Sequence, residues 1–507
     1  MKVKLVNLVF GLNKLLESPC RWLGYAGLVV VTLLTRFYQL GRNPLWLDEL
    51  YSYQVSTQDL ATILRNSLYE THPPLYDLLL KATSGFGLWR TEWGIRWFSA
   101  VCGTVTLIIF YYLVSRLINR WSALWGWLLL LFSPTVMYYS QEARPYIVDL
   151  LVATLTTTIL LSLLDPQKSS RRLWFAWGIF SIIGIYIAYS YLLVLLVQAG
   201  CLILAYRVNR RMITTLGLVV LGLFPLPPIM LSNLTRDLQA VNTDTPLTFI
   251  GLVQALLAGG QARYGLFWGS IWLPILFGLL AVLGLWALFE RRNIFAGYII
   301  LQVVFPLGMY FLVGAFFFHW RMPNYQSRQF LVLLPAFFLW VVLGLDWCAR
   351  HLLLCIKYSV VIIVSIILLT ASLAGLERYW TITKSPEGLA TQLVRQYLEP
   401  GEAVVSLHYS LTAAASFYLT HESKIYTAPQ PVGSDYLFDD NPLLLIGQVK
   451  LNPRFSLATV RAHPGVWILS DTRWDRTVRN ILIQDCRITV QQMFGPFEVV
   501  RIEQCPL

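Results

Sequence analysis

Two adjacent carboxylates, Asp48 and Glu49, stand in the stretch NPLWLDELYSY, shortly after the first apolar run of the chain. Their neighbours, Trp46, Leu47 and Leu50, are aromatic or apolar, which predicts a position near a membrane interface. A carboxylate in such surroundings is a stronger base than one in water. The pair could therefore take a proton from an attacking hydroxyl group; the alternative is a helix cap or a solvated loop.

Further polar residues are expected near the same membrane surface. The stretch THPPLYDLLLK places His72 before two prolines, and MYYSQEARPYIVD contains Glu142, Arg144 and Asp149. Carboxylates, a cation and aromatic rings at one membrane depth are typical of a functional site. Structural alternatives stay open: Arg144 could pair with Glu142, Asp149 could bond to a neighbouring helix, and His72 could serve only a turn.

The composition predicts a polytopic α-helical membrane protein. Of the 507 residues, 56% are hydrophobic and 13% are charged, whereas soluble domains carry roughly 25% charged residues. Several apolar runs reach the ~20 residues that a membrane-spanning helix needs. The first run has no small-residue cleavage site after it, so it is interpreted as a retained helix.

The basic residues indicate the topology. The net charge is +12, but the basic residues do not form a single stripe, which argues against a nucleic-acid partner. They occur in short clusters between apolar runs, as in cytoplasmic loops. A cytoplasmic N-terminus and about eleven spans place every cluster inside: 22–40, 97–115, 122–139, 145–164, 173–188, 190–206, 212–232, 270–289, 294–314, 329–346 and 352–374.

This topology gives two outer regions and leaves one point open. The first outer loop, 41–96, carries the polar residues, and its segment STQDLATILRNSLYE predicts an interfacial helix. A weaker candidate for such a helix lies in the outer loop at 234–268. Whether the fifth and sixth spans, which meet at YIAYSYL, are separate is left open. The membrane core is thus 1–374, in the plasma (inner) membrane, followed by an extracytoplasmic domain at 375–507.

The last region predicts a mixed α/β domain. SPEGLATQLVRQYL, AAASFYLT and TVRNILIQD are expected to be helices, and EAVVSLHY, SKIYTA and GVWILSDT strands. The domain contains no glycine-rich phosphate loop. Its end, CRITVQQMFGPFEVVRIEQC, predicts a hairpin that turns at Gly495-Pro496 and brings Cys486 opposite Cys505. We expect a disulfide there, in an oxidising compartment; the alternative is two free thiols in a shifted register.

Five stretches together carry a resemblance to a known family. They are LWLDELYS, THPPLYDLLLK, IRWFSAVCGTV, YYSQEARPYIVDLLVATL and SRQFLVLLPAFFLWVVLGL. Over roughly residues 20–350, the chain resembles membrane glycosyltransferases of the GT-C superfamily. It is most similar to the family 39 branch of protein O-mannosyltransferases and lipid A aminoarabinose transferases.

The resemblance implies a reaction and roles for named residues. A sugar would pass from a polyprenyl-phosphate donor to an acceptor hydroxyl on the outer face, with inversion; Asp48 would be the general base and Glu49 its companion. Where the aminoarabinose enzymes have a phosphate-binding lysine before the paired prolines, this sequence has His72, which is only partly charged at neutral pH. Donor-phosphate binding is therefore also expected from three arginines: Arg144, Arg321 and Arg328.

Several questions stay open at this stage. The sugar and the acceptor, which could be a protein, a lipid or a glycan, are not specified. Some relatives use a divalent metal ion and others do not, and no His/Cys cluster has zinc-ligand spacing. One alternative function is a transporter or flippase of lipid-linked sugars, although no inverted repeat is evident. The other is a non-catalytic cell-envelope assembly protein.

Overall fold

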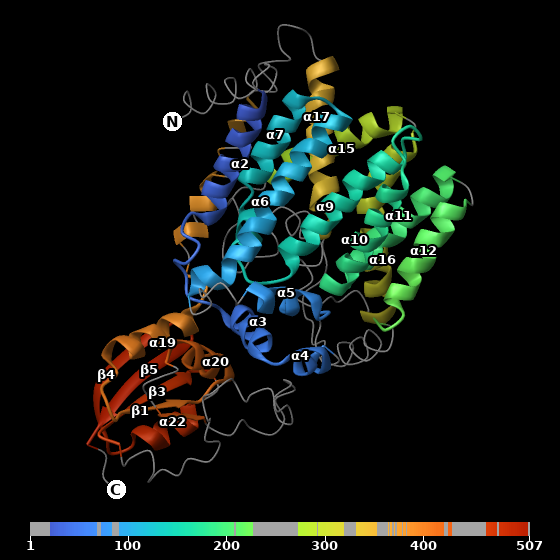
Figure 1. Cartoon of the computed structure of the whole chain (residues 1–507). Coiled ribbons are helices and arrows are strands. Elements are labelled where there is room, and N and C mark those ends of the chain that lie inside the picture. Colours follow the sequence, from blue (N-terminus) through green and yellow to red (C-terminus); the bar gives the residue numbers. More distant parts are fainter. Residues whose placement is uncertain are drawn as a thin grey trace. The chain divides into compact units, whose positions relative to one another are not determined.

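The computed structural model describes residues 21–67, 72–83, 91–206, 209–226, 272–291, 293–318, 331–351, most of 363–381, 383–419, 424–427, 463–473 and 476–504 (Figure 1). The chain forms two compact units. The helical unit comprises 1–38, 65–76 and 96–382, and the mixed unit comprises 39–64, 77–95 and 383–507. Two segments of the first outer loop thus group with C-terminal residues. The domain boundary at residue 374 stays a prediction.

The helical unit is built from long apolar helices. They are α2 (Arg21–Phe37), α6 (Glu92–Leu117), α7 (Arg120–Leu131), α8 (Pro134–Ser140), α9 (Tyr146–Leu163), α10 (Arg171–Ile187), α11 (Tyr191–Tyr206), α12 (Arg210–Leu223), α15 (Trp272–Arg291), α16 (Ile294–Phe318) and α17 (Leu334–His351). Each of the first ten predicted spans overlaps one of these helices. Most of the eleventh, 352–374, lies outside the described residues.

The structure shows where helices begin and end within three of the predicted spans. The span at 122–139 is two helices, because Ser133 caps α8 by accepting a hydrogen bond from the Val136 N–H and Pro134 follows as its first residue. The fifth and sixth spans are separate helices, α10 and α11. By length and composition, three described helices could cross a membrane, namely Glu92–Leu117, Tyr146–Leu163 and Leu331–His351. The total of about eleven spans stays a prediction.

Basic residues at several described helix ends lie at one end of the bundle, here called the basic end: Arg116 and Arg291 line one cavity, and Arg116 and Lys168 line its neighbour. Arg291, at the end of α15, donates to the Leu117 carbonyl at the end of α6 over 3.2 Å. Asn119, before α7, donates to Asp346 near the end of α17 over 3.2 Å. This grouping of helix ends is what the alternating topology requires; the side of the membrane that the basic end faces stays a prediction.

Buried hydrogen bonds join four helices in the middle of the bundle. Gln198 of α11 accepts from the Trp177 indole of α10 over 2.7 Å and donates to Thr156 of α9 and Tyr298 of α16, each over 3.1 Å. Figure 1 shows α9, α10 and α11 side by side. In a bilayer, which offers no water as a substitute partner, such bonds hold the helices in register.

The mixed unit contains first-loop helices and an α/β domain. The loop helices are α3 (Leu47–Thr57), α4 (Leu60–Asn66), which falls in the predicted interfacial segment, and part of α5 (Leu75–Thr83). The second predicted interfacial helix, at 234–268, lies outside the described residues. The α/β domain contains α19 (Pro386–Tyr397), β1 (Ala403–Ser406), α20 (Tyr409–Tyr418), β2 (Lys424–Thr427), β3 (Gly465–Asp471), α22 (Arg476–Ile483), β4 (Arg487–Phe494) and β5 (Phe497–Glu503).

The sheet has the order β2-β1-β3-β5-β4, and both of its faces are covered. Strands β1, β2 and β3 are parallel, and β5 runs antiparallel to β3 and β4. Helices α19 and α20 bury one face around Val404 and Trp467, and α22 packs Leu482 onto the other (Figure 1). The helices and strands predicted from the sequence are therefore all present in this domain.

The terminal hairpin turns where the sequence predicts. Gly495 has φ +59°, which glycine adopts without strain, and Phe494 pairs with Phe497 across the turn. An irregularity between Ile488 and Val490 shifts the register by one residue toward the open end. Cys486 is disulfide-bonded, and its expected partner, Cys505, lies outside the described residues.

Helices α15 and α17 contact each other through paired glycines. A Cβ atom on Gly284 would lie 1.9 Å from the Trp340 carbonyl oxygen, and one on Gly344 would lie 2.0 Å from that of Leu280. Neither position has room for a methyl group, because the neighbour in each case is backbone. This close approach resembles small-residue contacts between membrane helices.

We expect Gly284→Ala and Gly344→Ala each to destabilise the protein by about 1–3 kcal/mol, the usual range for overpacking. Gly278→Ala is the matched control on α15, because no atom lies within 4 Å of a Cβ placed there. Thermal unfolding of the detergent-solubilised variants measures the difference. Equal unfolding temperatures for Gly284→Ala and Gly278→Ala would contradict the close contact.

Candidate active site

The first turn of α3 carries the acidic pair. Glu49 is fully buried, and its Oε2 accepts a hydrogen bond from the Trp46 N–H over 3.4 Å, so it caps the helix that contains it. Asp48 is half-buried in the same turn. The positive end of the helix dipole favours a negative charge there. The two carboxylates therefore differ: Glu49 has a structural bond at the cap, and Asp48 is the more accessible one.

A third carboxyl group, Glu387, lies beside this turn. Its Oε1 accepts a hydrogen bond from the Leu47 N–H over 3.0 Å. Burial raises the pKa of Glu387 to about 7, and the nearby charge of Asp48 acts in the same direction. From the sequence, Glu387 is only an acidic residue in the first turn of a helix, and nothing indicated contact with a segment 340 positions away.

Two more bonds hold the chain before α3 against the C-terminal helices. Ser385, which caps α19, donates to the Leu45 carbonyl over 2.8 Å. The Leu45 N–H in turn donates to the Tyr418 hydroxyl of α20 over 2.9 Å. The position of Asp48 in the mixed unit is therefore fixed by α19 and α20 as well as by its own helix.

In the helical unit, His72 and Arg144 share one aromatic partner. His72 Nε2 lies 3.4 Å from the Tyr146 hydroxyl, and the Arg144 guanidinium carbon lies 5.9 Å from the centre of the Tyr146 ring. Tyr139 packs edge-on against that ring, with centroids 5.2 Å apart. Two cation-capable groups thus meet at the start of α9, where an anionic ligand could be held.

The turn before α9 is stabilised by polar contacts. The Arg144 N–H donates to the carbonyl of Glu142, a buried residue, over 2.9 Å. Gln141 donates to the carbonyls of Arg36 and Tyr38 at the end of α2, over 2.9 and 2.8 Å. Gln141 has no distinguishing signal in the sequence, yet its side-chain bonds position the SQEARPY turn.

Asp149 has the bond to a neighbouring helix that the structural alternative envisaged. Its Oδ2 accepts from Ser190 over 2.9 Å, in the short break between α10 and α11. Oδ1 is buried and has no hydrogen-bond partner among the described residues. Asp149 therefore connects α9 to this break through Oδ2, whereas Oδ1 accepts no hydrogen bond from the described residues.

The remaining predicted site residues are distributed as follows. Arg321 and Arg328 lie outside the described residues. Asp48 and Glu49 belong to the mixed unit, whereas His72, Glu142, Arg144 and Asp149 belong to the helical unit. Within the described part of the chain, no group of three His, Cys, Asp or Glu residues is arranged to hold a metal ion. Metal dependence stays open.

Comparisons with known proteins define the class of this fold. Residues 71–231 match the family model described as dolichyl-phosphate-mannose-protein mannosyltransferase. The structure is similar to that of ArnT from Cupriavidus metallidurans in the apo state, with TM-score 0.59 and 14% identity over 94% of this chain and 97% of that one. The structure is thus similar to that of a GT-C glycosyltransferase, in line with the resemblance in the sequence.

Two further solved structures share this fold. ArnT from the same organism bound to undecaprenyl phosphate has TM-score 0.56 and 13% identity, over 96% of this chain and 98% of that one. An oligosaccharyltransferase from Archaeoglobus fulgidus, in complex with Zn and sulfate, has TM-score 0.50 and 9% identity, over 78% and 61%. No curated protein matches the sequence.

We expect Glu387→Gln to stabilise the protein at pH 8 and to change little at pH 5. The unfolded carboxyl group ionises near pH 4.5 and the folded one near pH 7, so the folded state binds the proton more tightly. Wild-type stability therefore falls as pH rises from about 4.5 to about 7. The glutamine side chain would keep an acceptor for the Leu47 N–H but cannot ionise, with a gain of up to about 3 kcal/mol at pH 8.

Thermal unfolding across this pH range measures the difference between variant and wild type. Glu399→Gln is the control, because the Glu399 side chain is exposed and lies 12 positions after Glu387. Its stability relative to wild type should show no such trend with pH. An equal destabilisation by Glu387→Gln at pH 5 and pH 8 would show that its charge is not suppressed in the folded protein.

Proposed function

We propose that this protein is a membrane glycosyltransferase that moves a sugar from a polyprenyl-phosphate carrier to an acceptor hydroxyl on the outer face of the membrane. The observation that carries the proposal is the meeting of His72 and Arg144 at Tyr146. Both residues lie in the region that the mannosyltransferase family model matches. The similarity to ArnT, a protein solved with undecaprenyl phosphate bound, supports a lipid-phosphate donor.

The chemistry needs positive charge at the leaving group. When the bond between the anomeric carbon and the phosphate oxygen breaks, the carrier phosphate gains negative charge. Arg144 supplies a permanent positive charge, and His72 supplies one when protonated. Arg321 and Arg328 are proposed as further donor-phosphate contacts. Tyr146 positions the first two side chains by contacting both.

The acceptor side of the reaction needs a base. In the proposed step the acceptor oxygen forms a bond to the anomeric carbon, its proton passes to Asp48, and polyprenyl phosphate departs with the electrons of the broken bond. One displacement of this kind inverts the anomeric centre. Glu49 and Glu387 support Asp48 by fixing the helix turn that carries it.

We expect Asp48→Asn to reduce transfer about 100-fold or more, because a general base typically contributes that much or more to the rate. Membranes containing each variant receive radiolabelled polyprenyl-phosphate sugars, and label is followed into endogenous acceptors. Asp59→Asn is the control from the same loop: Asp59 caps α4 through Thr62, and asparagine caps equally well.

Each outcome of this comparison has a distinct meaning. Loss of transfer in the folded Asp48→Asn variant alone supports the proposed base, and retained transfer makes Glu142 the next candidate. If even the wild type transfers no sugar, the transporter and assembly alternatives are favoured. A product with retained anomeric configuration, determined by NMR, would exclude the single displacement.

We expect His72→Ala and Arg144→Ala to weaken use of the donor about 10-fold or more, because each would lose a hydrogen bond to a charged phosphate. His72→Lys should preserve or improve donor use, since lysine is charged throughout the neutral range. The apparent KM for the donor in solubilised membranes measures both effects. If the lysine and alanine variants lost the same amount, His72 would serve the turn rather than the phosphate.

A further inference from the structure

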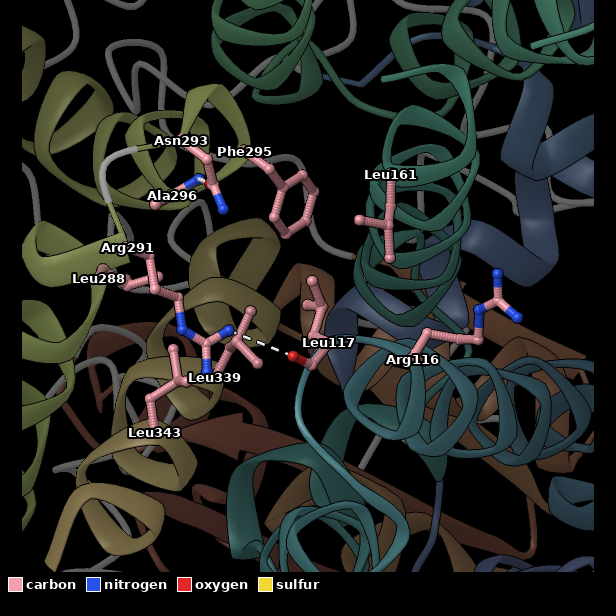
Figure 2. Close-up of a pocket in the computed structure, with 10 residues that line it drawn as sticks. All are labelled: Arg116, Leu117, Leu161, Leu288, Arg291, Asn293, Phe295, Ala296, Leu339 and Leu343. Atoms are coloured by element: carbon pink, nitrogen blue, oxygen red, sulfur yellow. Dashed lines mark hydrogen bonds between the residues drawn. The ribbon is translucent and has the colours of Figure 1, made fainter. Parts of the chain in front are cut away.

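A second candidate binding site lies at the basic end of the helical unit, where five helices meet. A cavity of about 160 Å³ is lined by residues from the ends of α6, α9 and α15, the start of α16 and one side of α17. Its polar lining residues include Arg116, Arg291 and Asn293, and its walls are leucines and Phe295 (Figure 2). This cavity is here called the basic pocket.

The two arginines bring positive charge to the basic pocket. Figure 2 shows Arg291 directed at the Leu117 carbonyl, its only hydrogen bond to another described residue. Arg116 stands at the rim, with its guanidinium carbon 6.0 Å from the centre of the Tyr112 ring on its own helix. Within the described part of the chain, neither arginine forms an ion pair with a carboxylate.

The acidic residues near the basic pocket are already engaged. Asp346 is paired with Arg350 over 2.6 Å, and Asp165 is paired with Lys168. Glu290 accepts a hydrogen bond from the Trp286 indole over 2.8 Å. Asp165 and Asp346 also interact electrostatically with Arg116 and Arg291, but each forms its close ion pair with another cation. The four cationic side chains here, Arg116, Arg291, Arg350 and Lys168, outnumber the three carboxylates.

A neighbouring hollow extends the same surface. It has a volume of about 110 Å³ and shares Arg116 and Leu161 with the basic pocket. Lys168 and its ion-pair partner Asp165 line it as well, so three cationic side chains and one carboxylate border the two adjoining cavities. Both cavities are large relative to the ~30 Å³ that one molecule occupies in liquid water.

The surroundings favour a lipid over a free ion. Side chains next to the lining residues in sequence are apolar and strongly exposed: Phe289 is 63% exposed and Ile294 is 45% exposed. In a membrane helix such residues face acyl chains. A ligand with a phosphate at the arginines and hydrocarbon beside these residues has the chemistry of a phospholipid.

We propose that the basic pocket binds the phosphate of an anionic phospholipid from the leaflet at the basic end. Basic pockets between membrane helices recognise lipid headgroups in this way. Arg291 is half-buried, so its guanidinium would donate to phosphate with less competition from water, whereas Arg116 at the rim is exposed. The site lies at the opposite ends of the helices from His72, Arg144 and Tyr146, since α9 begins at Tyr146 and ends beside Leu161. It is therefore separate from the proposed donor site.

The test uses the full chain in detergent, titrated with short-chain phosphatidylglycerol, short-chain phosphatidylcholine or inorganic phosphate, with thermal unfolding as the readout. Of these three additives, only phosphatidylglycerol should raise the unfolding temperature. Arg116→Gln and Arg291→Gln should each weaken its apparent affinity about fivefold. Arg210→Gln, which removes an exposed basic residue of α12 away from the pocket, is the control and should change it little.

Three results would overturn the proposal. Equal stabilisation by inorganic phosphate would identify a free-anion site, and equal affinity in all three variants would place the lipid elsewhere. Loss of polyprenyl-phosphate binding in the pocket variants would make this the carrier site. If Arg291→Gln fails to fold because it loses the Leu117 contact, Arg116→Gln decides the question, since Arg116 forms no hydrogen bond to another described helix.

Discussion

Three hydrogen bonds between the backbone of residues 45–47 and the C-terminal helices fix the turn that carries Asp48. They give partners to backbone groups at the start of α3 that would otherwise be buried unpaired. The approach is so close that a Cβ on Gly388 would lie 2.4 Å from the Cβ of Pro44. The position of Asp48 thus depends on α19 and α20, so under the proposed mechanism the C-terminal domain would support the catalytic base.

In the helical unit, buried polar groups need partners from the protein, because a membrane interior offers no water. Gln198 and its partners satisfy one another in the middle of the bundle, and the residues with candidate functions lie near the helix ends. The half-buried His72 and Arg144 and the buried Tyr146 thus lie at the helix ends, apart from this central network. A rigid support of this kind is what a site for an anionic headgroup requires.

Much of the fold could be predicted because its signals are local. Apolar runs and capping residues gave helix positions close to those observed, and Ser385 and Gly495 marked a helix start and a hairpin turn. The break between α7 and α8 also had a signal, Ser133 followed by Pro134, which the length of the apolar run obscured. The total number of spans stays a prediction, because most of the eleventh span lies outside the described residues.

The candidate site was predictable only in part, because some of its contacts span long sequence separations. Membrane depth grouped His72 with Arg144, but the central aromatic, Tyr146, looked like one of many interfacial anchors. Capping-box spacing could have separated the role of Glu49 from that of Asp48, had the cap been serine or threonine rather than Trp46. No local sequence pattern predicts the contact between Glu387 and Leu47, because the two residues are 340 positions apart.

The long separation between Leu47 and Glu387 also has a consequence for biosynthesis. Ribosomes add about 5–20 residues per second, so α3 emerges tens of seconds before the helices that complete its first turn, 340 residues later. During that interval the apolar side chains of the loop are not yet covered by α19 and α20. The contacts around the acidic pair are therefore completed only when synthesis is nearly finished, and a chain truncated before α19 would lack the partners of the first turn of α3.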